Sequence, residues 1–273
     1  MTNSLSRLLG LPFALILIYC FTSGGLADFG IKTFLVLISI VALMLLYIFN
    51  RQVDIFWWKK RGLTLDAPLI SWMDRFAPSY AELSDEQKEN IQGRIALFMK
   101  VKNFTLKGKR DYQLEEDVKL IIAHEFMRIT LAQDPFYFPD YEQFVVYNHP
   151  FATPKIETLH AVEIYDEDGV VIFSKEQLVN GFVDPNHHIN VALLAAVMLF
   201  IAVHPRLQYP VVHDLEAQEI VDAHGLDLDH IHHVTALRNI NNLDLMLFCF
   251  FQFPRKNAEA FPERNKQLAS LFA

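Results

Sequence analysis

The stretch Val191-Ala-Leu-Leu-Ala-Ala-Val-Met-Leu-Phe200 lies inside 15 residues, from Ile189 to Val203, that carry no charge. A helix of that length measures about 22 Å, which is too short to cross a bilayer comfortably. We therefore expect a helix buried at the centre of a globular domain. Asp184-Pro-Asn-His-His-Ile-Asn190 leads into it.

The sequence on either side of this helix predicts further helices and a few short strands. Asp166-Glu-Asp-Gly169 separates two β-prone runs, which is typical of a hairpin, and Ser84-Asp-Glu-Gln87 is a capping box at the start of a helix. Helices are expected over about 84–100, 114–132, 189–203 and 243–253 with a short one after Pro262, and strands over 144–147, 162–165 and 170–173. This order of elements predicts an α+β fold.

The composition divides the chain into a basic, apolar head and an acidic body. The 273 residues carry a net charge of −8, with +4 in residues 1–61 and −12 in residues 62–273. An acidic balance argues against a nucleic-acid partner, because such proteins normally carry a basic patch. We expect the head, residues 1–61, to be a membrane anchor, residues 62–81 to be a linker, and residues 82–273 to be the folded domain.

Two uncharged stretches in the head are long enough to be transmembrane helices, over about 8–26 and 33–50. Basic residues collect on the cytoplasmic side of a membrane and Trp at its interface. The expected membrane-interface residues are Trp57, Trp58, Lys59, Lys60 and Arg61. We therefore expect both chain ends and the body to face the cytoplasm. A cleaved signal peptide remains an alternative for the first stretch.

Two groups of histidines are candidates for metal chemistry. His124-Glu125 begins like the zinc motif H-E-x-x-H, but position i+4 is Arg128, which has no lone pair for a metal. Glu125 and Arg128 are instead spaced for an ion pair on one helix face. Eight histidines lie between positions 187 and 233, and His230, His232 and His233 are the candidate surface ligands among them. Their spacing matches no zinc pattern, and a solvated surface explains them better.

Several segments of residues 82–273 resemble, in order and spacing, the Mlc titration factor A family of bacterial, gluzincin-type zinc peptidases. The segments are Leu83-Ser-Asp-Glu-Gln87, Leu120-Ile-Ile-Ala-His124, Tyr137 with Tyr141, Val146-Tyr-Asn-His-Pro-Phe151, Val171 to Gly181, Asn190-Val191, Cys249-Phe-Phe-Gln-Phe-Pro254 and Phe261-Pro-Glu263. The resemblance implies a zincin-like helical domain with a small sheet, a zinc cofactor and peptidase activity.

The resemblance also locates the positions where the family carries its zinc ligands and catalytic Glu. The first His falls on Leu194, the catalytic Glu on Ala195, the second His on Met198 and the third ligand on Phe248. A catalytic zinc needs three protein ligands, which Leu, Phe and a Met thioether do not supply. We therefore expect neither a zinc cofactor nor catalytic residues.

The leading hypothesis is a membrane-tethered pseudopeptidase that acts by binding or regulating a protein partner of unknown identity. A strand edge at Val170-Val-Ile-Phe173 is the predicted groove for that partner. One alternative is an active zinc-dependent peptidase with ligands drawn from the histidines between 187 and 233. Another is a membrane subunit whose two spans carry the function. Cys20 lies in the first expected membrane span and Cys249 in an apolar segment of the folded domain, so we expect no disulfide between them.

Overall fold

The computed structural model describes residues 5–22, 30–108, 114–134, 136, 138–237 and 240–272. The chain divides into two compact units, Met1–Leu63 and Thr64–Ala273. Cys20 and Cys249 are both buried and free, one in each unit.

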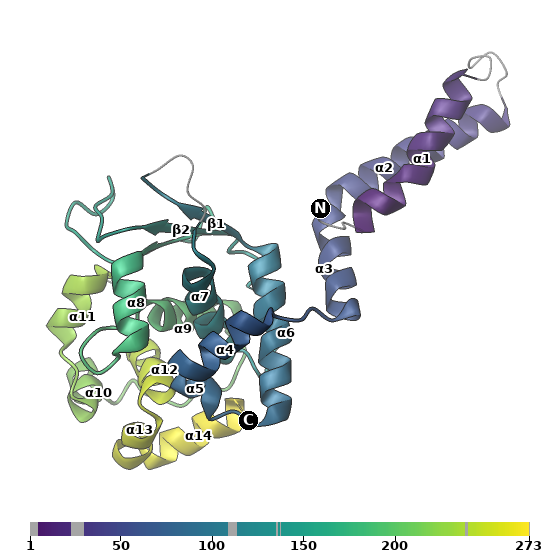
Figure 1. Ribbon diagram of the computed structural model, residues 1–273. Coiled ribbons are helices and arrows are strands. Elements are labelled where there is room, and N and C mark those ends of the chain that lie inside the picture. Colours follow the sequence, from purple (N-terminus) through teal and green to yellow (C-terminus); the bar gives the residue numbers. More distant parts are fainter. Residues whose placement is uncertain are drawn as a thin grey trace. The chain divides into compact units, whose positions relative to one another are not determined.

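The first unit contains three helices, which are α1 (Leu5–Thr22), α2 (Ile31–Ile48) and α3 (Asn50–Arg61) (Figure 1). By length and composition, α1 and α2 could each cross a membrane. Both begin a few residues before the spans predicted at 8–26 and 33–50, and positions 23–26 of the first span lie outside the described residues. The last turns of α3 carry the predicted interface residues, with Trp57 and Trp58 partly buried and Lys59, Lys60 and Arg61 exposed.

A carboxylate from α3 explains the early start of α1. Asp54 Oδ1 accepts a hydrogen bond from the Ser6 backbone N–H at 2.9 Å, and Oδ2 accepts one from the Ser6 hydroxyl at 3.2 Å. The first N–H groups of a helix have no partner within the helix, so a carboxylate there satisfies them and favours the positive helix end. The cap depends on a residue far along the chain and is invisible to local sequence patterns.

The second unit is a helical domain with one mixed sheet. Its helices are α4 (Ala67–Phe76), α5 (Pro78–Ala81), α6 (Asp85–Val101), α7 (Glu116–Arg128), α8 (Lys175–Val183), α9 (Val191–Val203), α10 (Ala217–His224), α11 (Leu228–Thr235), α12 (Asn242–Gln252), α13 (Pro254–Ala260) and α14 (Pro262–Phe272). Its strands are β1 (Asn103–Leu106), β2 (Gln143–Tyr147), β3 (Val162–Tyr165) and β4 (Val170–Ser174). The α+β prediction is confirmed.

The strand order β1-β2-β4-β3 places β4 inside the sheet. β4 pairs in parallel with β2 and antiparallel with β3. The antiparallel pair of β3 and β4 is the predicted hairpin. The groove predicted at the edge of residues 170–173 is therefore wrong, because both sides of β4 are paired. The edge strand of the hairpin is β3. The sequence analysis also missed β1, whose four residues carry little pattern, and α8, which Ser174 caps by accepting from Gln177 N.

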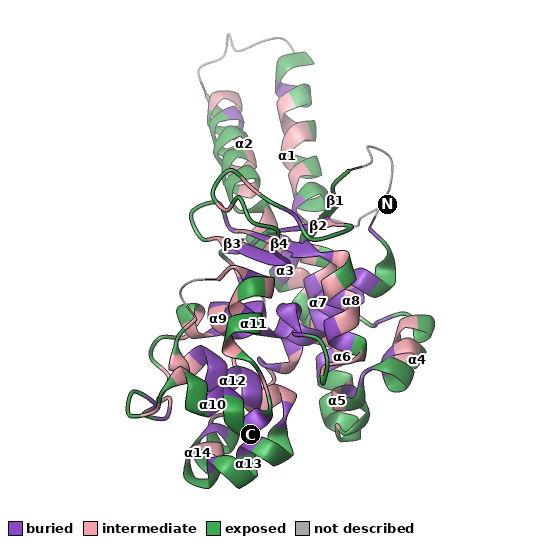
Figure 2. Cartoon of the chain, turned by 90° about the vertical axis from the view of Figure 1, so that its left-hand side faces the viewer, coloured by how far each residue is buried: buried purple, intermediate pink, exposed green. Residues whose placement is uncertain are grey.

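The predicted central helix, α9, is the core of the body. It contacts α7, α8, α12 and β3, and nine of its 13 residues are buried. Buried residues concentrate in α7, α9, α12 and the sheet (Figure 2). Asn190 caps this helix by accepting a hydrogen bond from Leu193 N at 3.1 Å. An all-round apolar helix is stable in water when neighbours cover most of its surface, as they do from Val191 to Val197.

The segment 62–81, predicted to be a linker, is mostly folded. It forms α4 and α5, and Met73, Ala77 and Tyr80 are buried. The Tyr80 hydroxyl accepts a hydrogen bond of 2.6 Å from Gln92 Nε2 of α6. The body therefore begins at Thr64 rather than at residue 82. Pro68 and Pro78 stand in the first turns of these two short helices, where proline is well tolerated.

A glycine sets how closely α8 approaches the start of α9. A Cβ atom at Gly181 would lie 2.2 Å from the Ile189 carbonyl oxygen and 2.8 Å from the Asn190 Cα. Real side chains do not approach backbone so closely, so only glycine fits. The contact fixes the position from which Asn190 caps α9.

We predict that Gly181→Ala destabilises the protein by about 1–3 kcal/mol, because the added methyl group must displace backbone at residues 189–190. Chemical denaturation of the detergent-solubilised chain measures the change. Asn180→Ala, at a partly exposed position of the same helix, is the control and should change stability by less than about 0.5 kcal/mol. Equal effects of the two substitutions would contradict the close approach.

Candidate functional site

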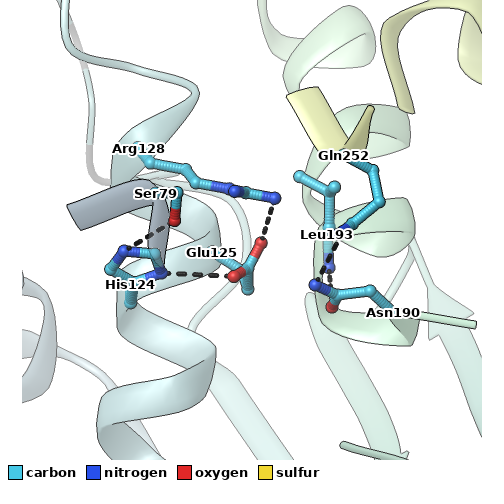
Figure 3. A network of polar contacts seen from close by, with 7 residues as sticks. All are labelled: Ser79, His124, Glu125, Arg128, Asn190, Leu193 and Gln252. Atoms are coloured by element: carbon cyan, nitrogen blue, oxygen red, sulfur yellow. Dashed lines mark hydrogen bonds and ion pairs between the residues drawn. The ribbon is translucent and has the colours of Figure 1, made fainter. Parts of the chain in front are cut away.

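A buried polar network joins α5, α7, α9 and α12 (Figure 3). His124 Nε2 lies 3.5 Å from the Ser79 hydroxyl, and His124 Nδ1 lies 3.2 Å from Glu125 Oε1. Arg128 NH2 lies 2.8 Å from Glu125 Oε2, which confirms the predicted ion pair. His124 and Glu125 are at most 1% exposed. The half-motif His124-Glu125 is thus occupied by protein partners rather than directed to a metal.

The carboxylate of Glu125 is the electrostatic centre of this network. Burial raises the pKa of Glu125, but Arg128, His124 and Asn190 lower it by more, so the net shift is downward. The ionised form is therefore the stable one in the folded protein. Asn190 also donates from Nδ2 to Gln252 Oε1 at 3.1 Å, which links the start of α9 to the end of α12.

The four positions that the resemblance assigns to zinc chemistry lie on α9 and α12. Leu194 and Ala195 are fully buried and Phe248 is 2% exposed, while Met198 is partly exposed. The two helices contact one another. Apolar side chains therefore stand at all four positions, three of them buried in the core.

A cavity of about 590 Å³ adjoins Met198. Edge strand β3 and the C-terminal half of α9 line it, together with the start of α12, the segment after α11 and the loop that precedes β3. The lining residues are Lys155, Ile156, Glu163, Ile164, Asp166, Met198, Leu199, Ile201, Ala202, Ala236, Leu237, Asn241 and Asp244. The cavity has an apolar floor and carboxylates on its walls, which is a usual composition for a binding site. No residue of this cavity except Met198 was a candidate site residue in the sequence analysis.

Glu163, on the wall of the cavity, forms a pair with His160. His160 Nδ1 lies 2.8 Å from the Thr158 carbonyl oxygen, and its Nε2 lies 3.3 Å from Glu163 Oε2. Because a carbonyl oxygen only accepts, Nδ1 carries a proton, and the contact at Nε2 requires a second proton on one partner. Glu163 is 2% exposed, and its Oε1 makes no hydrogen bond within the part of the chain described.

A second buried carboxylate, Asp244, lines the same cavity at the start of α12. Its Oδ2 accepts a hydrogen bond of 2.9 Å from the Asn241 backbone N–H. Burial raises the pKa of Asp244 to about 6, so the carboxylate is mostly ionised at pH 7 and takes up a proton more readily than an exposed Asp when the pH falls. Carboxylates with a shifted pKa gather at functional sites, so Asp244 is a candidate functional residue as well as part of the cap of α12.

The His-rich region does not assemble a metal site. His224 is buried, and Nδ1 donates to the Ile220 carbonyl at 2.7 Å, while His187 pairs with Asp184 and His232 with the Leu237 carbonyl. His230 and His233 are exposed on α11. Within the described ranges, no group of three His, Cys, Asp or Glu side chains is placed to hold a metal ion. Burial lowers the pKa of His224, which keeps that ring neutral.

Comparison with known proteins identifies the family. The sequence profile described as glucose-regulated metallo-peptidase M90 matches residues 55–194, which is just over half of the chain. The chain belongs to this family. The match ends at Leu194, so Ala195, Met198 and Phe248 lie beyond it. An uncharacterized protein of Synechocystis sp. is 30% identical over 95 residues, which are 34% of this chain and 33% of that relative.

The residues at the family's zinc positions do not fit the metal. Leu194, Ala195 and Phe248 have no donor atom, and the Met198 thioether is a poor ligand for Zn²⁺. His160 contacts Glu163, but among the described residues neither Glu163 nor Asp244 belongs to a group of three His, Cys, Asp or Glu side chains that could hold a metal ion. We therefore derive no reaction step through zinc.

We predict that Glu125→Gln destabilises the protein by about 3 kcal/mol at pH 7, because it leaves the Arg128 charge poorly paired in the interior. The folded-state pKa of Glu125 is lowered, so its contribution is complete above the unfolded carboxyl pKa of about 4.3 and is lost as the pH falls further. Denaturation at several pH values tests this.

The gap in unfolding free energy between the wild type and Glu125→Gln should therefore be wide at pH 7 and narrow on acidification toward pH 3. Glu259→Gln, at an exposed carboxylate of α13, is the control, and its gap should be small at every pH. A gap for Glu125→Gln that is independent of pH would show that Glu125 is not ionised in the folded protein.

Proposed function

We propose that this M90-family protein is a membrane-anchored pseudopeptidase that binds a partner protein at the cytoplasmic face of a bacterial inner membrane. It would act by binding or regulation rather than by hydrolysis. The supporting observation is the contrast between α9 and the cavity beside it. Leu194, Ala195 and Phe248 are closed into the core, while the adjoining cavity at Met198 stays open.

The character of the substitutions supports lost chemistry with a retained fold. Without metal ligands no bound metal can lower the pKa of a water or polarise a peptide carbonyl, so the chain would lack the groups that metal-dependent peptide hydrolysis requires. Removing one ligand alone would strand the other polar groups in the core at about 1–3 kcal/mol each. Apolar residues at all the positions avoid that cost, and α9 keeps its cap from Asn190.

The packing of the first unit supports an anchor that is retained rather than cleaved. Asp54 caps α1 at Ser6, and Cys20 near the other end of α1 is 1% exposed. A Cβ atom on Gly10 would lie 3.5 Å from the Leu43 side chain of α2, an ordinary packing distance. The basic residues Lys59, Lys60 and Arg61, which end α3, favour a cytoplasmic body.

We predict that the full-length chain, purified in detergent with zinc in the buffer and then dialysed, retains much less than one equivalent of zinc. It should also leave a mixture of unstructured peptides uncleaved, because the positions on α9 and α12 offer no donor set. Metal analysis by mass spectrometry and peptide mapping are the measurements. The same preparation after chelator treatment is the matched control.

One equivalent of zinc that survives dialysis, with peptide cleavage that the chelator abolishes, would overturn the pseudopeptidase proposal. That result would establish the rival, an active zinc-dependent peptidase whose histidine ligands come from elsewhere in the chain.

We also predict that protease added to spheroplasts spares epitope tags at both ends of the chain but removes a tag placed between Gly24 and Gly25. The reason is that two antiparallel spans return the chain to the side on which it began. Lysis before the protease treatment is the control that exposes all tags. Loss of the N-terminal tag from the mature protein would instead indicate a cleaved signal peptide.

A further inference from the structure

The cavity beside β3 contains a hydrogen-bond acceptor that lacks a donor. Glu163 Oε1 is buried and makes no hydrogen bond within the described residues. A hydrogen bond with Thr153 lowers the pKa of Tyr165, whereas burial, a side-chain hydrogen bond with Glu163 and the charge of that carboxylate together raise it by more. No hydrogen bond within the described residues reaches Glu163 Oε1 itself. Whether the shared proton is on His160 or on Glu163 Oε2, Oε1 remains an acceptor.

The charge of the cavity wall points to a cation as the missing donor. Glu163, Asp166 and Asp244 line the cavity, and Lys155 is the basic residue among the lining side chains. The Lys155 ammonium lies over the Tyr165 ring, 5.2 Å from its centre, and forms no ion pair of 4.0 Å or less in the part of the chain described. Asp166 accepts a hydrogen bond of 2.7 Å from the Tyr141 hydroxyl, which leaves Glu163 and Asp244 as the buried acidic groups.

The apolar lining of the cavity fits the methylene stem of a lysine or arginine side chain, and strand β3 beside it could pair with the backbone that carries this side chain. Met198, Leu199 and Ile201 provide apolar surface for a methylene stem, along which such side chains commonly pack. The rim is β3, which stands at the end of the strand order, so one side of it pairs with no other described strand. An extended segment can add to such an edge by main-chain hydrogen bonds.

We propose that this cavity binds the lysine or arginine side chain of an extended segment of a partner protein, with Glu163 and Asp244 receiving its cationic head. This inference rests on the proposed function and specifies the partner's chemistry. The partner segment lies along β3 and places one basic residue between β3 and α9. The apolar residue at position 198 then contacts the stem of the bound side chain where the family would hold a metal.

The test uses the full-length chain in detergent and fluorescein-labelled, capped peptides of the sequence serine–valine–X–valine–serine. X is lysine, arginine, norleucine or glutamate, and fluorescence anisotropy gives each Kd. The lysine or the arginine peptide should bind at least about tenfold more tightly than the norleucine peptide, which keeps the stem but lacks the charge. The glutamate peptide should bind most weakly, and added salt should narrow the differences.

Variants then connect the preference to the cavity. Glu163→Gln and Asp244→Asn should each reduce the binding of the basic peptides by about tenfold and leave the norleucine peptide unchanged. Glu176→Gln, at an exposed carboxylate that pairs with His149, is the matched control and should change neither. Ala202→Trp adds bulk at an exposed position of the lining and should abolish binding of the basic peptides with the fold intact, even if Glu163→Gln fails to fold.

The outcomes separate this inference from the proposed function. Equal binding of the lysine, arginine and norleucine peptides would overturn the basic-residue inference and leave a peptide-binding pseudopeptidase standing. An absence of binding for all peptides at millimolar concentration would overturn the inference as well. Cleavage of a bound peptide would instead overturn the pseudopeptidase proposal itself.

Discussion

The buried carboxylate of Glu125 is the constraint around which the body is organised. An ionised group in the interior is stable only when charges and hydrogen-bond donors surround it. Arg128 and His124 supply them from its own helix, and Asn190 does so from the start of α9. Ser79, near the beginning of the body, and Gln252, at the end of α12, join the same network. Polar contacts around this charge therefore join α5 to α7 and the start of α9 to the end of α12.

The polar network and the cavity meet different parts of α9. Glu125 is satisfied at the N-terminal end of that helix, whereas Met198 meets the open cavity toward the other end. The proposed binding role uses the C-terminal half of α9, where Met198, Ile201 and Ala202 are not buried and line the cavity.

Sequence patterns predict the parts of this fold that depend on neighbouring residues. The uncharged run of α9, the hairpin around Asp166 to Gly169 and the Glu125–Arg128 pair are local features, and all three are present. Local patterns do not predict the close approach at Gly181, because the Ile189 backbone that it meets belongs to the segment after α8. Sequence patterns could not predict the cavity, because Glu163, Met198 and Asp244 come together from three elements that are distant in the chain. Residues 62–81 were expected to be a linker, but Pro68 and Pro78 begin helices there.

The Ser6–Asp54 cap has a consequence for biosynthesis. The carboxylate that completes the first turn of α1 stands 48 residues downstream, so the emerging chain lacks it until translation has passed position 54. Until then, the start of α1 must rely on water or lipid headgroups for its unpaired amides. A truncated nascent chain that ends before residue 54 therefore lacks the carboxylate that caps the start of α1.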